Sequence, residues 1–246
     1  MNFARRPFLA LAGLGFLIGT PLVRAAERTV RGSGAAATQR REVGAFAGIG
    51  LGGPFAVVLR PGNRQAIEIV ADDNLLPYIE TRLTGDGAHR SLTLGVVRGT
   101  RLEPRTPIVV TIDYVRLGDL AVGGSGSIGA KAMKAAQLDA SIGGSGSIDL
   151  ADLDVGMLAV AIGGSGTFRS DGRARRLSVS VGGSGRCDAE RLVAGEVEVA
   201  LAGSGDTRVR AETKLEATIA GSGSIFHSGA ATPQAAIVGS GRVRRI

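Results

Sequence analysis

The triplet Gly-Ser-Gly occurs seven times between residues 124 and 241, and its spacing limits the possible folds more than any other feature. The serines of these triplets stand at positions 125, 145, 165, 184, 204, 222 and 240, so successive copies are 16 to 20 residues apart. A period near 20 residues is typical of a solenoid, in which each repeat forms one coil. We therefore expect the second half of the chain to stack copies of one small unit.

Apolar residues alternate in the segment that precedes most of these triplets. The clearest examples are LDASI at 138–142, LAVAI at 158–162, LSVSV at 177–181, VEVAL at 197–201 and LEATI at 215–219. Alternation with a period of two indicates a strand with one buried face. A second recurring position follows each triplet, and it is occupied by Ile128, Ile148, Phe168, Cys187, Thr207, Ile225 and Val243. We expect these residues to stack in a column, in which Thr207 is the weak member because a buried hydroxyl needs a partner.

Together these patterns predict an all-β fold, a right-handed parallel β-helix with about 20 residues per coil. Equivalent residues of neighbouring coils would stack about 4.8 Å apart, and no coil buries its apolar face without its neighbours. Glycine allows positive φ and close backbone approach at a sharp corner. The serine between the glycines can bond to nearby backbone and form a ladder. We interpret the triplet as a corner of the coil, because no histidine stands at a recognisable catalytic spacing from any of the seven serines.

The first half of the chain also favours strands. Short β-branched runs between turn residues occur at 55–60, 66–71, 78–84, 91–97 and 107–113. No stretch of about 12 residues after residue 25 has convincing helical periodicity. We predict one domain over 43–246, with N-terminal strands at 43–120 that continue into or cap the repeat coils at 121–246.

Residues 1–25 have the features of a signal peptide. Arg5 and Arg6 precede an apolar run from Phe8 to Ile18, which is too short to span a bilayer. The sequence RRPFL at 5–9 is similar to the twin-arginine export signal, and the general secretion route and an uncleaved anchor are the alternatives. Cleavage is expected after Ala25, which predicts a periplasmic or secreted protein. Residues 26–42 lack periodic apolar residues and are predicted to form a flexible lead-in.

The composition argues against several classes of function. Removal of Arg5, Arg6 and Arg24 leaves 26 basic and 22 acidic residues, a net charge of +4, and the chain has no Trp and two Tyr. Nucleic-acid binding usually needs a basic stripe with aromatic stacking platforms, so no nucleic-acid partner is expected. Cys187 is the only cysteine, which rules out an intrachain disulfide and a thiolate metal cluster.

Two glycine-rich stretches resemble ligand motifs only superficially. Residues 48–53 satisfy G-x-G-x-x-G, but Pro54 and a strand follow in place of the helix that a dinucleotide site needs. Residues 143–149 are similar to a calcium-binding repeat, but the positions equivalent to Asp149 include three arginines. Since calcium needs six or more oxygen ligands, we predict no metal site and no cofactor.

Acidic residues on successive coils raise one enzymatic alternative. Carboxylates from neighbouring coils can act as general acid and base in a shared groove, and the candidates are Asp152, Asp154, Asp171, Asp188 and Glu190. Many arginines share this region, which favours a solvated face of mixed charge. The two histidines, His89 and His227, are far apart in sequence and are not predicted to form a catalytic pair.

The order of these features resembles the family called putative auto-transporter adhesin, head GIN domain. The resemblance is carried by GPFAVVLRPG at 53–62, IEIVADDNLLPYIETRL at 67–83, SLTL at 91–94 and the triplet repeats from Gly124 onward. It covers roughly residues 43–246 and implies an exported bacterial β-helix. It implies no catalytic residues, and none are assigned.

The function predicted is a non-enzymatic binding, adhesin-like or assembly module of the cell envelope. Its partner would be a protein or an envelope glycan, and open coil edges could also join copies into a homo-oligomer. The arginines at 242, 244 and 245 would restrain uncontrolled stacking at the last coil. The alternative is a carbohydrate-active β-helix, a lyase or hydrolase, that uses the acids at 152–190.

Overall fold

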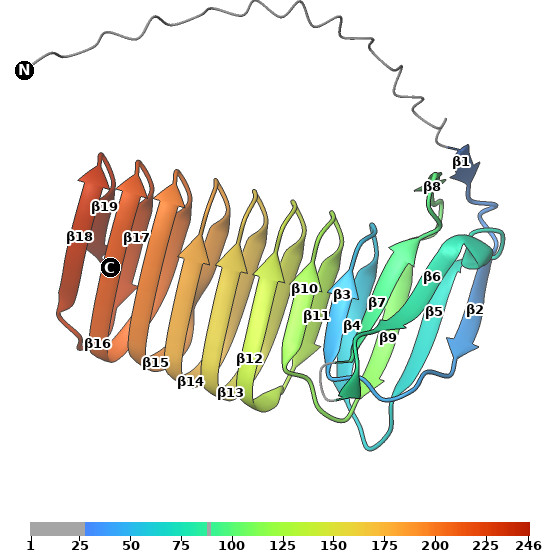
Figure 1. Cartoon of the computed structure of the whole chain (residues 1–246), viewed down its shortest axis with the longest axis horizontal. Coiled ribbons are helices and arrows are strands. Elements are labelled where there is room, and N and C mark those ends of the chain that lie inside the picture. The colour runs from blue at the N-terminus through green and yellow to red at the C-terminus, as the bar shows by residue number, and fades with distance from the viewer. Residues whose placement is uncertain (1–27, 88–89) are drawn as a thin grey trace, which may run out of the picture.

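The computed structural model describes residues 28–87 and 90–246, and it confirms the predicted all-β solenoid. The described chain forms about six turns of about 20 residues each. In Figure 1 the coils lie side by side along the long axis of the molecule. The strands β18 (Pro233–Gly239) and β19 (Arg242–Arg245) lie at one end, and β2 (Ala36–Arg41), β5 (Ala66–Asp72) and β6 (Ile79–Thr84) lie at the other. The predicted signal peptide at 1–25 lies outside the described residues.

The N-terminal half contains short strands and one 3-10 turn. These elements are β1 (Arg28–Arg31), β2 (Ala36–Arg41), β3 (Gly48–Leu51), β4 (Ala56–Pro61), β5 (Ala66–Asp72), η1 (Leu76–Tyr78), β6 (Ile79–Thr84), β7 (Ser91–Val96), β8 (Thr100–Glu103) and β9 (Val109–Tyr114). The predicted strands at 55–60, 66–71, 78–84, 91–97 and 107–113 correspond to β4, β5, β6, β7 and β9. The sequence patterns did not reveal β3 and β8 as strands.

The repeat coils contain longer strands that bend from one face of the solenoid to the next. These strands are β10 (Asp119–Val122), β11 (Ser127–Lys131), β12 (Lys134–Ile142), β13 (Ser147–Ile162), β14 (Thr167–Val181), β15 (Arg186–Gly203), β16 (Asp206–Gly221), β17 (Ser224–Ser228), β18 (Pro233–Gly239) and β19 (Arg242–Arg245). Pairing between successive coils is parallel throughout this half.

The register of these strands stacks like residues in columns, as the repeat predicted. Leu138 lies opposite Leu158, and Leu158 lies opposite Leu177. The predicted column after the triplets is also in register from coil to coil, and all its members before Val243 are buried. Aliphatic side chains therefore fill the interior of the solenoid in continuous stripes.

Close backbone approach, more than positive φ, explains the glycines of the triplets. A Cβ on Gly146 would lie 2.4 Å from the carbonyl oxygen of Gly126, and one on Gly144 would lie 2.5 Å from the oxygen of Gly124. Among the first glycines of the seven triplets, only Gly203, Gly221 and Gly239 have positive φ. The backbone of each corner therefore packs directly on the backbone of the corner before it, and a side chain at Gly144 or Gly146 would have no room.

The ladder along the corner is made by backbone amides and not by serine hydroxyls, which differs from the prediction. The amide nitrogen of Ser145 donates to the oxygen of Gly124 at 3.2 Å, and that of Ser165 donates to Gly144 at 3.1 Å. The seven serine side chains are exposed, and within the described ranges none of their hydroxyls has a protein hydrogen-bond partner. The serine is tolerated because its side chain points into solvent.

Thr207 is buried in the column, with its side chain between those of Cys187 and Ile225. Its hydroxyl is buried and has no hydrogen-bond partner, so it is the weak position that the sequence predicted. Replacement by valine keeps the shape and removes the unsatisfied hydroxyl. We expect Thr207→Val to raise the free energy of unfolding by about 1 kcal/mol, measured by urea denaturation. An unchanged or lower value would show that the hydroxyl finds a partner in solution.

The N-terminal strands both extend the solenoid and cap it. β3 pairs in parallel with β10 and β7, while β4 pairs in parallel with β11 and β9, which continues the stack of coils. At the end of the stack, β5 pairs antiparallel with β9 and β2, and β6 pairs antiparallel with β7. These antiparallel strands cover the apolar interior at this end.

The prediction of a flexible lead-in at 26–42 was wrong for residues 28–42, because β1 pairs with β8 and β2 pairs with β5. Side chains of the ADDN segment at 71–74 also bind the lead-in. The buried carboxylate of Asp72 accepts hydrogen bonds from the amides of Gly34 (2.9 Å) and Arg105 (2.8 Å) and from the amide and hydroxyl of Thr106 (3.1 and 2.9 Å). The lead-in lacks apolar periodicity because β2 is a largely exposed edge strand, so its order comes from backbone pairing and these bonds.

Candidate functional site

The strands that precede the triplets present a flat surface of small, uncharged side chains. We define the small-residue face as the last outward column of the strands before each corner. Each of its residues lies opposite the same position of the next coil. Its members are Gly50, Ala121, Ser141, Ala161, Ser180, Ala200, Thr218 and Ala236. The column that follows towards the corner is also uncharged, with Gly123, Gly143, Gly163, Gly182, Ala202, Ala220 and Val238.

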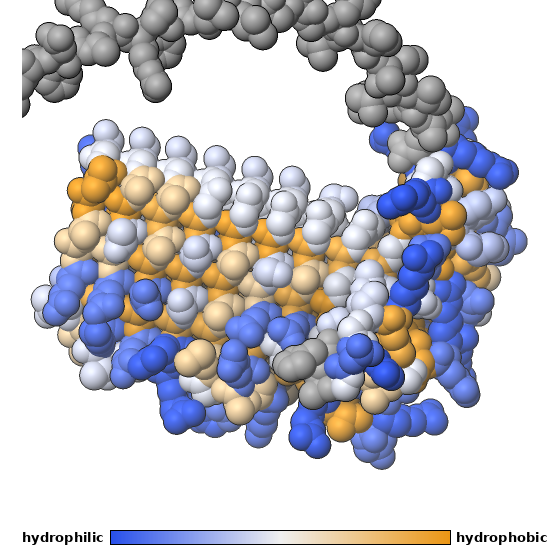
Figure 2. Space-filling model, viewed as in Figure 1, coloured by the Kyte–Doolittle hydropathy of each residue, from blue (hydrophilic) through white to orange (hydrophobic). Residues whose placement is uncertain are grey.

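Figure 2 shows this face as an uncharged band that runs the length of the coils beside the corners, above a hydrophilic region. From Ser141 to Ala236 the side chains of the column are exposed. Its other neighbour column carries the acids Asp119, Asp139, Glu198 and Glu216. Because small side chains on stacked rungs are rigid and lose little rotamer entropy, such a face can meet another flat surface at low entropic cost.

The strands that follow the triplets carry charges of alternating sign along the solenoid axis. One outward column runs from Asp149 through Arg169, Asp188 and Arg208 to Phe226 and then Arg244. The guanidinium of Arg208 lies 5.2 Å from the centre of the Phe226 ring, a cation–π contact. Each charge therefore has an opposite charge or an aromatic ring on a neighbouring coil.

The acids of the enzymatic alternative are distributed among arginines in the structure. Arg173 donates to both carboxylate oxygens of Asp154 at 2.9 and 2.8 Å, and hydrogen bonding to this guanidinium lowers the pKa of Asp154. Asp171 accepts from the amide of Asp152 at 2.7 Å and lies 3.6 Å from Arg191.

Among these acids, Asp154 lines a cleft together with Lys134 and Arg175. Asp152, Asp171, Asp188 and Glu190 do not line that cleft; Asp188 lies in the alternating column, and Glu190 is half-buried on β15. A general acid needs a raised pKa and a groove for its substrate. The structure therefore pairs Asp154 and Asp171 with arginines, and the cleft that contains Asp154 does not bring it together with the other four acids.

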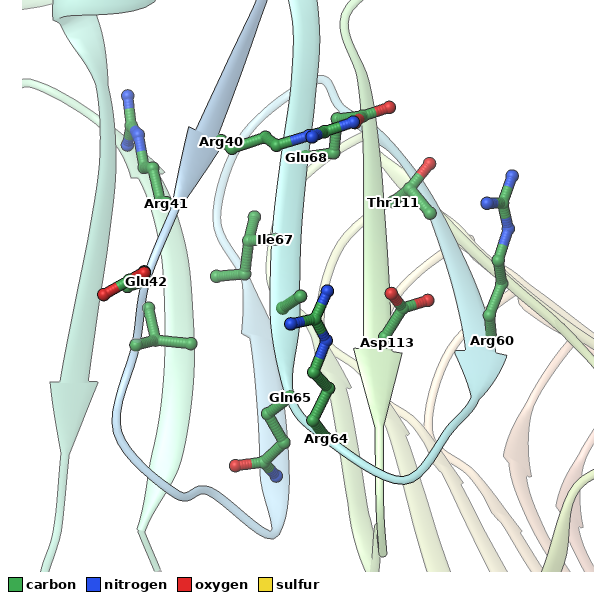
Figure 3. A pocket seen from close by; sticks show the side chains of 12 residues that line it. Arg40, Arg41, Glu42, Arg60, Arg64, Gln65, Ile67, Glu68, Thr111 and Asp113 are labelled. Carbon is green, nitrogen blue, oxygen red and sulfur yellow. The ribbon is translucent and has the colours of Figure 1, made fainter.

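A cleft of about 690 Å³ lies on the capping sheet at the N-terminal end (Figure 3). Neighbouring strands supply Arg40 and Glu68, which form an ion pair at 3.0 Å, and Thr111 beside them. In Figure 3, Asp113 lies between Arg60 and Arg64.

Charges of both signs line this cleft. Arg41 uses its guanidinium on the carbonyl oxygens of Ile79 and Leu76, at 2.7 and 3.1 Å. The remaining lining charges are three arginines and three acids, the acids being Glu42, Glu68 and Asp113. With Arg41 included, four arginines face three acids, so the lining has a net charge of only +1 with which to select an anion.

His227 and Cys187, the other candidate reactive side chains that the structure describes, are buried. His227 is buried on β17, where burial, followed by the charge of Arg245, lowers its pKa. His89 lies outside the described residues. Cys187 is fully buried in the inward column, and burial raises its pKa to about 12, so its thiol is not a nucleophile.

The ligand motifs considered from the sequence have ordinary places in the fold. Gly48–Leu51 of the G-x-G-x-x-G stretch form β3, in the middle of the parallel stack, with no helix after it. In the described part of the chain, no three His, Cys, Asp or Glu side chains are grouped as metal ligands. Over the same residues no helix is long and apolar enough to cross a bilayer.

Comparison with protein families gives one match, over most of the chain. The model of the family described as putative auto-transporter adhesin, head GIN domain, matches residues 45–231. No curated protein matches.

Several solved structures have a similar fold, among them two putative adhesins and a putative lipid binding protein. A putative adhesin from Bacteroides fragilis has a TM-score of 0.81 and 22% identity, covering 88% of this chain and 100% of its own. A putative lipid binding protein from Parabacteroides distasonis has a TM-score of 0.75 and 24% identity, with 89% and 100% covered. A putative adhesin from Parabacteroides merdae has a TM-score of 0.65 and 23% identity, with 89% and 99% covered. At identities of 22 to 24%, these comparisons show a shared fold and no shared function.

Proposed function

The chain belongs to the putative auto-transporter adhesin, head GIN domain family, and on that premise we propose that it is a non-enzymatic, adhesin-like binding module of the cell envelope. The observation that carries the proposal is the small-residue face, a rigid, uncharged surface that spans the stacked coils. The proposed partner is a protein or a glycan of the envelope. Flat surfaces built from in-register strands suit an extended partner more than a small molecule.

The small-residue face gives a direct test of binding. We expect the double variant Ala161→Lys, Ala200→Lys to weaken binding to isolated cell envelopes on the order of tenfold, because two long charged side chains would hold a flat partner away from the face. The matched control is Met157→Lys, Val193→Lys, which adds the same charge to exposed apolar positions outside the face.

Binding is measured by titrating purified protein onto envelopes, polysaccharides and lipid vesicles. The vesicles are included because one structural neighbour is named a putative lipid binding protein. If both double variants bind as the unchanged protein does, the small-residue face is not the binding surface.

The enzymatic alternative makes the opposite prediction for the same polysaccharides. A lyase or hydrolase would turn them over and would lose activity on Asp171→Asn or Asp188→Asn. The ion pair of Asp154 with Arg173 and the contact of Asp171 with Arg191 support the binding module, because both carboxylates are already engaged by cations. We expect no turnover, and turnover that depends on either aspartate would establish an enzyme.

Export is part of the proposal. Membership of an adhesin family is consistent with an exported protein, and residues 1–25 supply the proposed signal, with its arginine pair at 5 and 6. If the twin-arginine route is used, Arg5→Lys, Arg6→Lys will leave the precursor in the cytoplasm, as seen by cell fractionation. Continued export of that variant would indicate general secretion.

A further inference from the structure

The two ends of the solenoid differ in how their interiors are covered. At the N-terminal end, antiparallel strands cap the stack, whereas within residues 28–87 and 90–246 no strand pairs with the outer edge of β18 or β19. Ile237 of β18 is 43% exposed, while Ile219, directly opposite it in the previous coil, is fully buried. Val243 and Ala235 also occupy inward columns of this coil, and no other described strand packs on their outer side.

Some backbone amides at the outer edge of β19 can also bind another strand. The amides of Arg242 and Ile246 donate to Gly223 and His227 of the preceding coil, at 3.2 and 3.0 Å. Alternate residues of a parallel strand bond to opposite sides, so the amides of Val243 and Arg245 point to the outer edge. An edge with free amides and carbonyls is a template for another strand.

The charges of the last coil have one sign. Residues 229–246 contain Arg242, Arg244 and Arg245 and no aspartate or glutamate. Arg244 is the last member of the column in which aspartate and arginine alternate at Asp149, Arg169, Asp188 and Arg208. In that column the aspartates lie opposite arginines, so the position beyond Arg244 would be stabilised by an acid.

We propose that this edge binds an extended polypeptide strand from a partner, with acidic residues at alternate positions opposite Arg242 and Arg244 and apolar residues between them. This inference rests on the proposed binding function and names a second, separate surface for it. The apolar residues of the added strand would cover Val243, and its backbone would pair with the free amides of β19. This is β-augmentation with charge selection.

Charge favours this partner over a second copy of the chain. Two copies joined through their last coils would bring arginine-rich edges together. A copy joined through its N-terminal end would present β2, which carries Arg40 and Arg41. Like charges across an interface suppress association.

The experiment measures binding of short fluorescent peptides to the full chain by anisotropy. The probes are a peptide that alternates glutamate and valine, one that alternates lysine and valine, and one in which the same glutamates form a block. We expect only the alternating acidic peptide to bind, and Arg242→Glu, Arg244→Glu to weaken it on the order of tenfold or more. The same variant should now bind the lysine peptide, because the charges are exchanged.

The control variant is Arg60→Glu, Arg64→Glu, which makes the same charge change in the cleft at the opposite end. Equal binding of the acidic peptide to both double variants, or no binding to the unchanged protein, would overturn the proposal. A dimer in light scattering that dissociates on Val243→Pro would also overturn it, by assigning the edge to a second copy. If Ala161→Lys, Ala200→Lys weakens envelope binding and Arg242→Glu, Arg244→Glu does not, the proposed function is supported and this inference about the edge is not.

Discussion

Gly146→Ala will lower the free energy of unfolding by about 3 kcal/mol or prevent folding, whereas Gly143→Ala, three residues earlier in the same corner, will change it little. The Cβ of an alanine at 146 would lie 2.4 Å from the oxygen of Gly126 and 2.5 Å from a methyl carbon of Val122. A backbone oxygen cannot move aside without breaking the ladder between two coils. The added methyl group would therefore push the coils apart at their closest contact.

Gly143 is the matched control because a Cβ there meets nothing within 4 Å, and its φ is not positive. The equivalent positions of later coils already carry the side chains of Ala202 and Ala220. Urea denaturation followed by far-UV circular dichroism measures both variants against the unchanged protein. Equal stabilities of the two variants would show that the corner can widen, and that close approach does not explain the repeated triplet.

Asp72→Ala will release the lead-in from the N-terminal cap and lower the melting temperature by several degrees. The variant leaves three amides, of Gly34, Arg105 and Thr106, without the acceptor that they share in the folded protein. These amides come from two segments far apart in sequence, so one carboxylate joins the lead-in to the loop before β9. Limited proteolysis should then cut first near Arg31 and Arg41, and mass spectrometry identifies the sites.

The pH dependence of stability gives an independent readout for Asp72. Burial raises its pKa, but the hydrogen bonds from Thr106, Arg105 and Gly34 outweigh that effect and hold the pKa below its ordinary value. In the unfolded chain an aspartate titrates near about 3.9. The stabilisation is therefore fully present above that pH and is lost as the pH falls below it, towards the lower pKa of the folded state.

A comparison of the unchanged protein with Asp72→Ala isolates the pH-dependent stabilisation by this carboxylate. Between about pH 6 and pH 3, the unchanged protein should lose more stability than Asp72→Ala. The control is Asp119→Ala, which removes an exposed carboxylate. If Asp72→Ala and the unchanged protein have the same acid dependence, or if Asp119→Ala has the larger effect, the carboxylate of Asp72 does not hold the cap.

Much of the fold could be predicted because the same physical demand recurs in each coil. The spacing of the triplets gave the length of the coil, and the alternation before them gave its buried face. The N-terminal strands at 55–60 and 66–71 were also recognisable, since each has one apolar side. By contrast, β1 and β2 have no such signal, because exposed strands owe their order to the backbone of β8 and β5 and not to their own side chains.

The candidate surfaces were harder to predict than the fold. The small side chains of Ala161 and Ser180 are visible in the sequence, but they form a face only because the parallel register places them opposite each other. The same register pairs Arg173 with Asp154, 19 residues apart, and so makes one of the candidate catalytic acids part of an ion pair. A one-residue change in register would have exchanged the inward and outward sides.

By itself, the sequence determined that this chain forms stacked coils of about 20 residues, since one coil with a glycine corner and alternating apolar residues buries its apolar face only against neighbouring coils. Only the tertiary structure decided which end is capped, which charges meet and which columns remain uncovered. Those properties depend on contacts between residues that are distant in the chain. Local patterns set the shape of one coil, whereas the function we propose depends on how the coils lie against one another.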